Sequence, residues 1–345
     1  MGNYNRPVKY LLTKTLNVKV MIPPKITNKT IELGIKNSPE FVCMPFKYTL
    51  GSYIEVLEKG SNILLQAGGG CRYGYYAELQ EQILKDLGYD FKLINLNSGG
   101  NYDLKSLYKL IKQLDPKFKM VKFIKYLIIT IKMVKYMDLI DDYIRQNIGF
   151  EVEKNSFIKL KNKMLNEFEQ VDSLIKLKIL YHKYKRKFRN LPVKKPKKVM
   201  KVGVIGELYT IMEPFANYFL ETELAKMNIE VKRYTNVYYL LFQKKRHLKY
   251  HLKNTKEFVK YKMGADATDN ISRAKYLCEN GYDGIIHIKS SFCTPEISAM
   301  PIISKVCREY NVPIIYFSFD ANTSEVGIRT RLEAFNDMLE MRRQK

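Results

Sequence analysis

Short apolar segments closed by glycine or proline alternate with helical periods at the start of the chain. Two such segments are Val18–Ile22 and Asn62–Gln66, and a helical period follows at Tyr76–Leu87. This alternation is typical of parallel strands joined by helices. Residues 1–102 are therefore predicted to form an N-terminal α/β domain.

The same alternation returns in the last third of the chain. The predicted elements there are, in chain order, Val199–Ile205 (strand), Ala216–Lys226 (helix), Gly284–Ile288 (strand), Glu296–Tyr310 (helix) and Ile314–Ser318 (strand). Residues 199–345 are therefore predicted to form a second, C-terminal α/β domain.

The middle of the chain has a different pattern. Residues 103–190 hold few Gly or Pro and carry Leu, Ile and Tyr at three- and four-residue spacing, which predicts a Lys-rich helical insert. Residues 191–198 contain two prolines and four lysines, which predicts a linker. The expected fold is α/β, with two Rossmann- or flavodoxin-like parallel-sheet domains and the insert between them. Because open parallel sheets bind ligands beyond the carboxyl ends of their strands, we expect a cleft between the two sheets.

The chain is strongly basic, with 59 Lys and Arg against 35 Asp and Glu and a net charge of +24. The excess is concentrated in residues 105–201, where 23 Lys and 3 Arg face 9 acids. Lysine dominates over arginine, whereas recognition of bases and phosphates favours arginine. A solvated helical surface is the preferred interpretation, which argues against nucleic acid as a partner. A polyanion-binding function remains as a remote alternative.

Cysteine usage and hydropathy indicate a compartment. The five cysteines form no CxxC pair and do not resemble the disulfide framework of a secreted domain. The start of the chain has no apolar run of signal-peptide length, and lysines interrupt the apolar stretch Phe123–Ile140. We therefore expect a cytoplasmic protein without a membrane segment.

Three cysteines stand in predicted loops with Gly or Pro neighbours, namely Cys43, Cys71 and Cys293, whereas Cys278 and Cys307 fall in helical periods. Thiolates from distant loops can together hold an iron–sulfur cluster. Three thiolates would leave one iron of a cubane without a cysteine. The spacing alone matches no compact metal signature, so ordinary thiols remain an alternative.

A glycine loop precedes the second of these cysteines. Gly68, Gly69 and Gly70 follow a predicted strand, and a helix opens a few residues later. Their backbone N–H groups could line a phosphate or a negatively charged cluster. The loop is neither GxGxxG nor a Walker motif, so the case for a nucleotide there is weak.

Other residue types give weaker indications. His247 and His251 are four residues apart, and an exposed helix face is preferred over a metal site for that pair. The chain has no GxSxG or HExxH motif, which disfavours an ordinary serine or zinc hydrolase. Four carboxylates near predicted strand ends are candidates for a site, with helix capping as the alternative. They are Glu207, Glu213, Glu296 and Glu325.

The contexts of the three loop cysteines resemble those of the 2-hydroxyacyl-CoA dehydratase and benzoyl-CoA reductase D-component superfamily. Within it, the chain is most similar to the branch labelled acyl-CoA dehydratase activase-related, or CoA protein activase. The stretches that carry the resemblance are Ser38–Lys47, Gly51–Glu55, Gly69–Tyr76, Gly203–Glu207, Glu213–Asn217, Phe292–Glu296, Thr323–Gly327 and Thr330–Phe335.

The resemblance implies a site and partners. By it, Cys43, Cys71 and Cys293 would ligate a [4Fe-4S] cluster between the two α/β domains, lined by the backbone of Gly68–Gly70. An ATP-dependent iron–sulfur activator would supply low-potential electrons under anaerobic conditions. The cluster could also be part of a double cubane, which would need three more thiolates from a second chain.

Two functions from the same resemblance stay open. One is a dehydratase-like lyase or low-potential reductase component that carries out radical dehydration or reduction of an acyl-CoA-type substrate. The other is a non-catalytic electron-transfer or partner subunit, in a homodimer or beside another dehydratase-type chain. The sequence has no CoA-specific motif that identifies a substrate.

Overall fold

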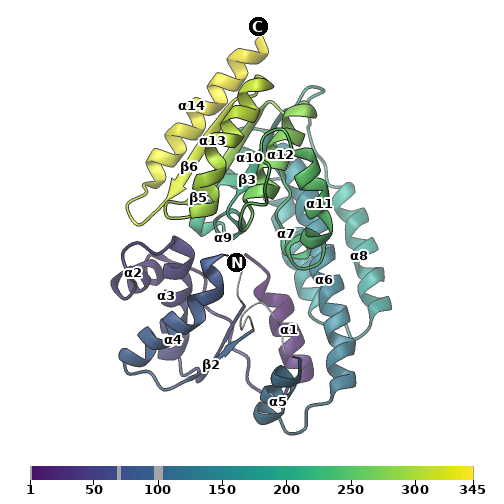
Figure 1. Ribbon diagram of the computed structural model, residues 1–345. Coiled ribbons are helices and arrows are strands. Elements are labelled where there is room, and N and C mark those ends of the chain that lie inside the picture. Colours follow the sequence, from purple (N-terminus) through teal and green to yellow (C-terminus); the bar gives the residue numbers. More distant parts are fainter. Residues whose placement is uncertain (1, 68–70, 97–103, 345) are drawn as a thin grey trace.

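The computed structural model describes residues 2–67, 71–96 and 104–344 (Figure 1). Its largest unit is built on a parallel sheet of four strands in the order β4-β3-β5-β6. The strands are β3 (Met200–Gly206), β4 (Ile229–Arg233), β5 (Gly284–Ser290) and β6 (Ile314–Phe319). Since β4 and β5 lie on opposite sides of β3, the strand order reverses at β3, the position where open α/β sheets bind ligands.

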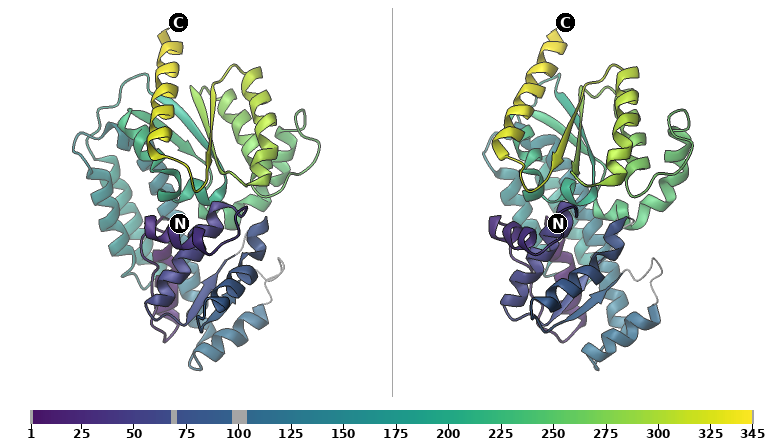
Figure 2. Two further views of the ribbon diagram at one scale, coloured as in Figure 1. Left: turned by 90° about the vertical axis from the view of Figure 1, so that its left-hand side faces the viewer. Right: turned by 60° about the vertical axis from the view of Figure 1, so that its left-hand side comes forward.

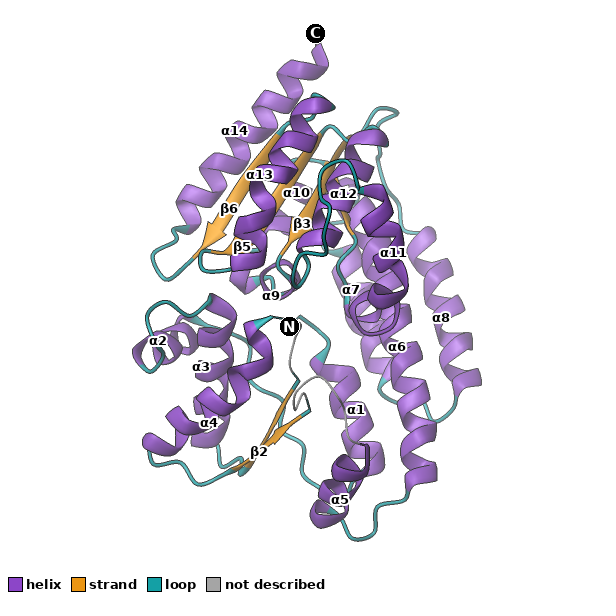
Figure 3. Ribbon diagram, viewed as in Figure 1, coloured by secondary structure: helices purple, strands orange, loops and turns teal. Residues whose placement is uncertain are grey.

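Helices cover both faces of this sheet (Figures 2 and 3). On one face, α9 (Leu208–Met212), α10 (Leu220–Lys226) and α14 (Glu325–Gln344) contribute to one core cluster. On the other face, α12 (Ala267–Glu279) and α13 (Thr294–Glu309) form a second cluster. Coverage of both faces of the sheet explains why every residue of β5 is buried.

A smaller α/β unit lies beyond the carboxyl ends of those strands (Figure 3). Its sheet, within the described residues, is the parallel pair β1 (Ile63–Gln66) and β2 (Lys92–Asn95). Around the pair lie α2 (Asn28–Lys36), α3 (Met44–Glu58), the 3₁₀ turn η1 (Arg72–Tyr75) and α4 (Tyr76–Asp86).

The middle of the chain is helical. It contains α5 (Leu104–Leu114), α6 (Met120–Asn147), the turn η2 (Ile148–Phe150), α7 (Ser156–Phe168) and α8 (Leu174–Arg189). Helices α6, α7 and α8 share an apolar core with Tyr10 of α1 (Asn5–Thr15). Helix α6 also contacts β4, so it connects the bundle to the large sheet.

The fold class and the strands predicted in the C-terminal part are confirmed. One strand prediction is wrong: Val18–Ile22 runs as irregular chain, and none of its five residues is buried, so this run is not held in a sheet by a packed core. The helix predicted at 216–226 is interrupted, because Tyr218 and Phe219 adopt left-handed backbone angles between the turn η3 (Phe215–Asn217) and α10.

The predicted domain boundaries stay a prediction, although two contacts bear on them. Helix α1 packs against α6 rather than on the small sheet. The predicted linker is tied to η2, since the Val152 amide donates to the Pro192 carbonyl at 3.1 Å and the Lys194 amide donates to the Phe150 carbonyl at 2.8 Å. None of the described helices has both the length and the apolar character that a membrane crossing requires.

The last residue of β3 generates a stability prediction. Gly206 has φ of 144°, and a Cβ there would lie 1.8 Å from the Ile288 carbonyl oxygen. We expect Gly206→Ala to lower the free energy of unfolding by about 2–4 kcal/mol. The matched control is Gly60→Ala, since Gly60 has φ of 85° with open space around it and should lose about 1 kcal/mol. Equal losses in chemical denaturation would contradict the close approach of β3 to β5.

Candidate functional site

The carboxyl ends of β3 and β5 face the small α/β unit (Figure 3). Cys293 lies beyond β5 and occupies the N-cap position of α13, and its side chain is buried. Burial raises the pKa of its thiol, and the charges of Glu207 and Glu296 raise it further. A hydrogen bond from the Glu296 amide acts in the opposite direction.

Cys43 reaches the same region from the small unit. It is the N-cap residue of α3, and its sulfur contacts the Tyr76 hydroxyl. Burial raises the pKa of the Cys43 thiol to about 12, although the Tyr76 hydrogen bond lowers it. The Met44 amide donates to the Ser290 hydroxyl at 2.9 Å, which fixes this loop to the end of β5.

Cys71 is the third loop cysteine and precedes η1 as its N-cap residue. Its thiol is half-buried, and burial raises its pKa. The charges of Glu207 and Asp266 also raise this pKa, whereas Lys244 lowers it. The predicted glycine loop Gly68–Gly70 lies outside the described residues.

Glu207 acts through its charge on all three of these thiols. It follows β3 directly and caps α9: one carboxylate oxygen accepts the Tyr209 amide at 2.7 Å. The other accepts the Thr210 amide at 2.8 Å and the Thr210 hydroxyl at 2.6 Å. Burial raises the pKa of Glu207 to about 7, against these three hydrogen bonds, which lower it.

The structure thus brings the three predicted cysteines into electrostatic range of one carboxylate. The Glu207 charge raises the pKa of Cys43, Cys71 and Cys293, and the charge of Cys71 raises the pKa of the other two thiols. Within the described ranges, no group of three or more His, Cys, Asp or Glu is arranged to hold a single metal ion.

A buried polar cluster lies beneath Cys293. Glu296 accepts from His287 Nε2 at 2.7 Å and from Asn270 Nδ2 at 3.0 Å, and all three side chains are at most 1% exposed. Asn270 also donates to the Gly206 carbonyl at 3.1 Å. The cluster therefore links the ends of β3 and β5 with α12 and the first turn of α13. Sequence analysis selected Glu296 as a candidate but missed its partners His287 and Asn270.

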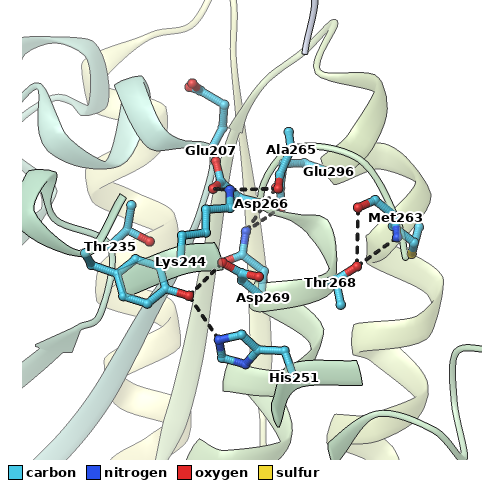
Figure 4. A network of polar contacts seen from close by, with 12 residues as sticks. Glu207, Thr235, Lys244, His251, Met263, Ala265, Asp266, Thr268, Asp269 and Glu296 are labelled. Atoms are coloured by element: carbon cyan, nitrogen blue, oxygen red, sulfur yellow. Dashed lines mark hydrogen bonds and ion pairs between the residues drawn. The ribbon is translucent and has the colours of Figure 1, made fainter. Parts of the chain in front are cut away.

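A second polar cluster flanks Glu207 (Figure 4). Lys244, at the start of α11 (Lys244–Asn254), pairs with Asp266 and donates to the Ala265 carbonyl at 2.8 Å. Asp266 is buried, and burial raises its pKa, whereas Lys244 lowers it. Lys244 is therefore a cation that offsets the negative charge of the site. Sequence analysis missed this pair because its two members are 22 residues apart, across an irregular loop.

The remaining predicted residues divide between the site and other places. Glu213 lies near the chain start and accepts the Gly2 amide at 2.8 Å, and Glu325 pairs with Arg329 within α14. His251 is buried rather than on an exposed face, because its ring bonds Tyr239 and Ser272. The two other cysteines, Cys278 and Cys307, lie in helices as predicted and are buried.

Comparison with known protein families gives an independent result. Residues 143–339, more than half of the chain, match the family of the 2-hydroxyglutaryl-CoA dehydratase D-component. The chain belongs to this family, which confirms the superfamily predicted from the cysteine contexts. No curated protein matches the sequence significantly.

The raised pKa of Glu207 predicts a pH dependence of stability in the metal-free chain. The folded state holds this proton more tightly than the unfolded chain, whose carboxyl has its ordinary pKa of 4.5. The proton on Glu207 therefore stabilises the folded state fully below pH 4.5, and this stabilisation is lost as the pH rises to about 7. Glu207→Gln removes this dependence, so the stability of the wild type relative to the variant should fall across that window.

Chemical denaturation at several pH values measures this difference. The control is Glu333→Gln, which changes an exposed carboxylate on α14 and should leave the wild-type pH profile unchanged. Parallel profiles for the wild type and Glu207→Gln would contradict a raised pKa at this position.

Proposed function

We propose that this dehydratase D-component-like protein binds a [4Fe-4S] cluster through Cys43, Cys71 and Cys293. The cluster would receive electrons from an ATP-dependent iron–sulfur activator and serve radical dehydration or reduction of an acyl-CoA-type substrate. The supporting observation is that the charge of one carboxylate, Glu207, acts on the thiols of all three cysteines, which come from distant loops.

The protonation of the thiols favours this ligand set. Burial and the Glu207 charge disfavour bare thiolates at all three cysteines. The positive charge of iron offsets both effects and stabilises the thiolate form. Cys43 and Cys293 also stand at the N-termini of long helices, where the helix dipole favours negative charge.

The number of predicted ligands is compatible with a cubane. Each thiolate of a cubane binds a different iron, so three cysteines would hold three of its four irons. Three cysteines would leave one iron open to another ligand.

A bound cluster supplies one-electron chemistry at low potential. The chain's own residues would position the cysteine loops and transfer protons. Glu207 carries a pKa of about 7, so its carboxyl oxygens can accept or release a proton near neutral pH. The Tyr76 hydroxyl contacts the Cys43 sulfur, and Ser290 holds the loop that carries it. Glu296, held by His287 and Asn270, fixes the first turn after Cys293.

A non-catalytic partner subunit is the second candidate function. The matched family is named for one component of a dehydratase, which favours function beside a second chain. Three loop cysteines would hold one cubane, so a double cubane would need thiolates from that chain. Turnover of an acyl-CoA by the purified chain with only activator and ATP would exclude this candidate.

The ligand set can be tested by anaerobic reconstitution with iron and sulfide. The wild type should bind about four irons per chain. Each of Cys43→Ser, Cys71→Ser and Cys293→Ser should lose most of this iron, because the remaining two thiolates hold a cubane weakly.

Cys278→Ala and Cys307→Ala are matched controls, since both thiols are buried in helices away from the site. Both should retain wild-type iron content. Equal iron in the wild type and in all three loop-cysteine variants would refute the ligand assignment.

A further inference from the structure

A cavity of about 690 Å³ lies between the helical insert and the large sheet, apart from the cysteine site. Its walls come from α6, the carboxyl end of β4 and the chain that follows it, α11 and α12. The volume is in the range of ordinary small-molecule sites. None of Cys43, Cys71, Cys293 and Glu207 lines this cavity.

The charged groups of the lining are unbalanced. Lys135, Lys232, Arg233 and Arg273 face only two lining carboxylates. Both carboxylates already have partners in the protein. Asp142 pairs with Lys232 at 2.8 Å, and Asp138 accepts the Tyr238 amide at 2.9 Å together with the Tyr4 hydroxyl. Arg233 pairs with Glu221 outside the lining at 2.9 Å.

Two cations of the cavity remain without a carboxylate. Arg273 is 5% exposed, and its guanidinium donates to the Thr235 hydroxyl at 2.6 Å and lies over the Tyr239 ring at 4.4 Å. Lys135 has its ammonium 5.3 Å from the centroid of the Tyr238 ring. Among the described residues, neither has a carboxylate within ion-pair distance. A buried arginine in this condition is stabilised by an anionic ligand.

Aromatic rings form much of the remaining wall. Five tyrosines line the cavity, of which Tyr250 is 53% and Tyr276 is 39% exposed. His251, deeper in the wall, bonds the Tyr239 hydroxyl at 3.0 Å and the Ser272 hydroxyl at 2.9 Å. Burial lowers the pKa of His251 to about 4, so it is neutral at pH 7 and adds no positive charge. Exposed tyrosines provide flat surfaces on which a planar ring can stack.

We propose that this cavity binds a nucleotide, with its phosphate on Arg273 and Lys135 and its base against the tyrosines at the rim. An anionic ligand without a ring would make no use of the tyrosines. A ring-containing ligand without negative charge would leave Arg273 and Lys135 unpaired. The recognised chemistry is therefore a free phosphorylated nucleoside.

Isothermal titration calorimetry on the purified, metal-free chain tests this proposal. Because no cluster is present, a negative result would overturn nucleotide binding and leave the proposed cluster function unaffected. The probes are AMP, ADP, adenosine, inorganic phosphate and CoA. We expect one molecule of AMP or ADP to bind per chain, and adenosine and phosphate to bind at least about tenfold more weakly. Saturable binding of CoA without binding of AMP or ADP would overturn the proposal, because it would indicate an acyl-CoA site instead.

Matched variants locate the binding. Lys135→Gln should weaken nucleotide binding about tenfold, whereas Lys132→Gln, an exposed lysine on the same helix, should leave it unchanged. Tyr250→Ala should weaken it, and Tyr261→Ala, which removes an 80% exposed ring outside the cavity, should not. Arg273→Gln should abolish binding, with thermal unfolding used to verify that the variant is folded.

Three results would overturn the proposal. The first is no saturable binding of AMP or ADP at millimolar concentration. The second is phosphate binding as tight as that of ADP. The third is equal effects of the Lys135 and Lys132 variants, which would place the ligand on the general positive surface of the insert.

Discussion

The burial of ionisable groups at the carboxyl ends of β3 and β5 is the constraint on which the site depends. Burial raises the pKa of all three thiols, and the negative charge of Glu207 raises each of these pKa values further. Such an arrangement is stable in the metal-free chain only if protons remain bound, and it favours a cation that can replace them. Glu207 keeps its place because two amides and one hydroxyl of α9 bind its oxygens.

The fold brings these groups together through strand ends and helix starts. The order of the large sheet reverses at β3, so the residues after β3 and β5 open into the same space. The small unit adds Cys43 and Cys71, and the bond between Met44 and Ser290 holds its first loop against β5. The polar cluster of His287, Glu296 and Asn270 then supports the turn that carries Cys293, as outer hydrogen bonds support the ligands of many metal sites.

The helical insert has a role beyond solvation of its lysines. Helix α6 belongs to the core of the bundle, yet it also contacts β4 and forms one wall of the cavity proposed to bind a nucleotide. A ligand there would contact both the insert and the large sheet. Its occupancy would therefore stabilise their relative position, whatever the state of the cysteine site.

Periodicity in the sequence was enough to predict the parallel strands β1, β3, β5 and β6, because each is a short apolar run with clear ends. It failed at Val18–Ile22, which runs as irregular chain, and it missed β2 and β4. In β4, Glu230, Lys232 and Arg233 hide the strand signal.

At the site, loop context selected Cys43, Cys71 and Cys293, and the end of β3 selected Glu207. The partners of these residues could not be predicted. Tyr76, Ser290 and His287 have ordinary sequence contexts, and only the packing of distant elements brings them to the site.

The most direct test of the central claim is an electron paramagnetic resonance spectrum of the anaerobically purified and reduced protein. A cluster held by the three loop thiols predicts an iron–sulfur signal whose spin content matches the bound iron. An iron-loaded sample with no such signal in either the oxidised or the reduced state would contradict the account.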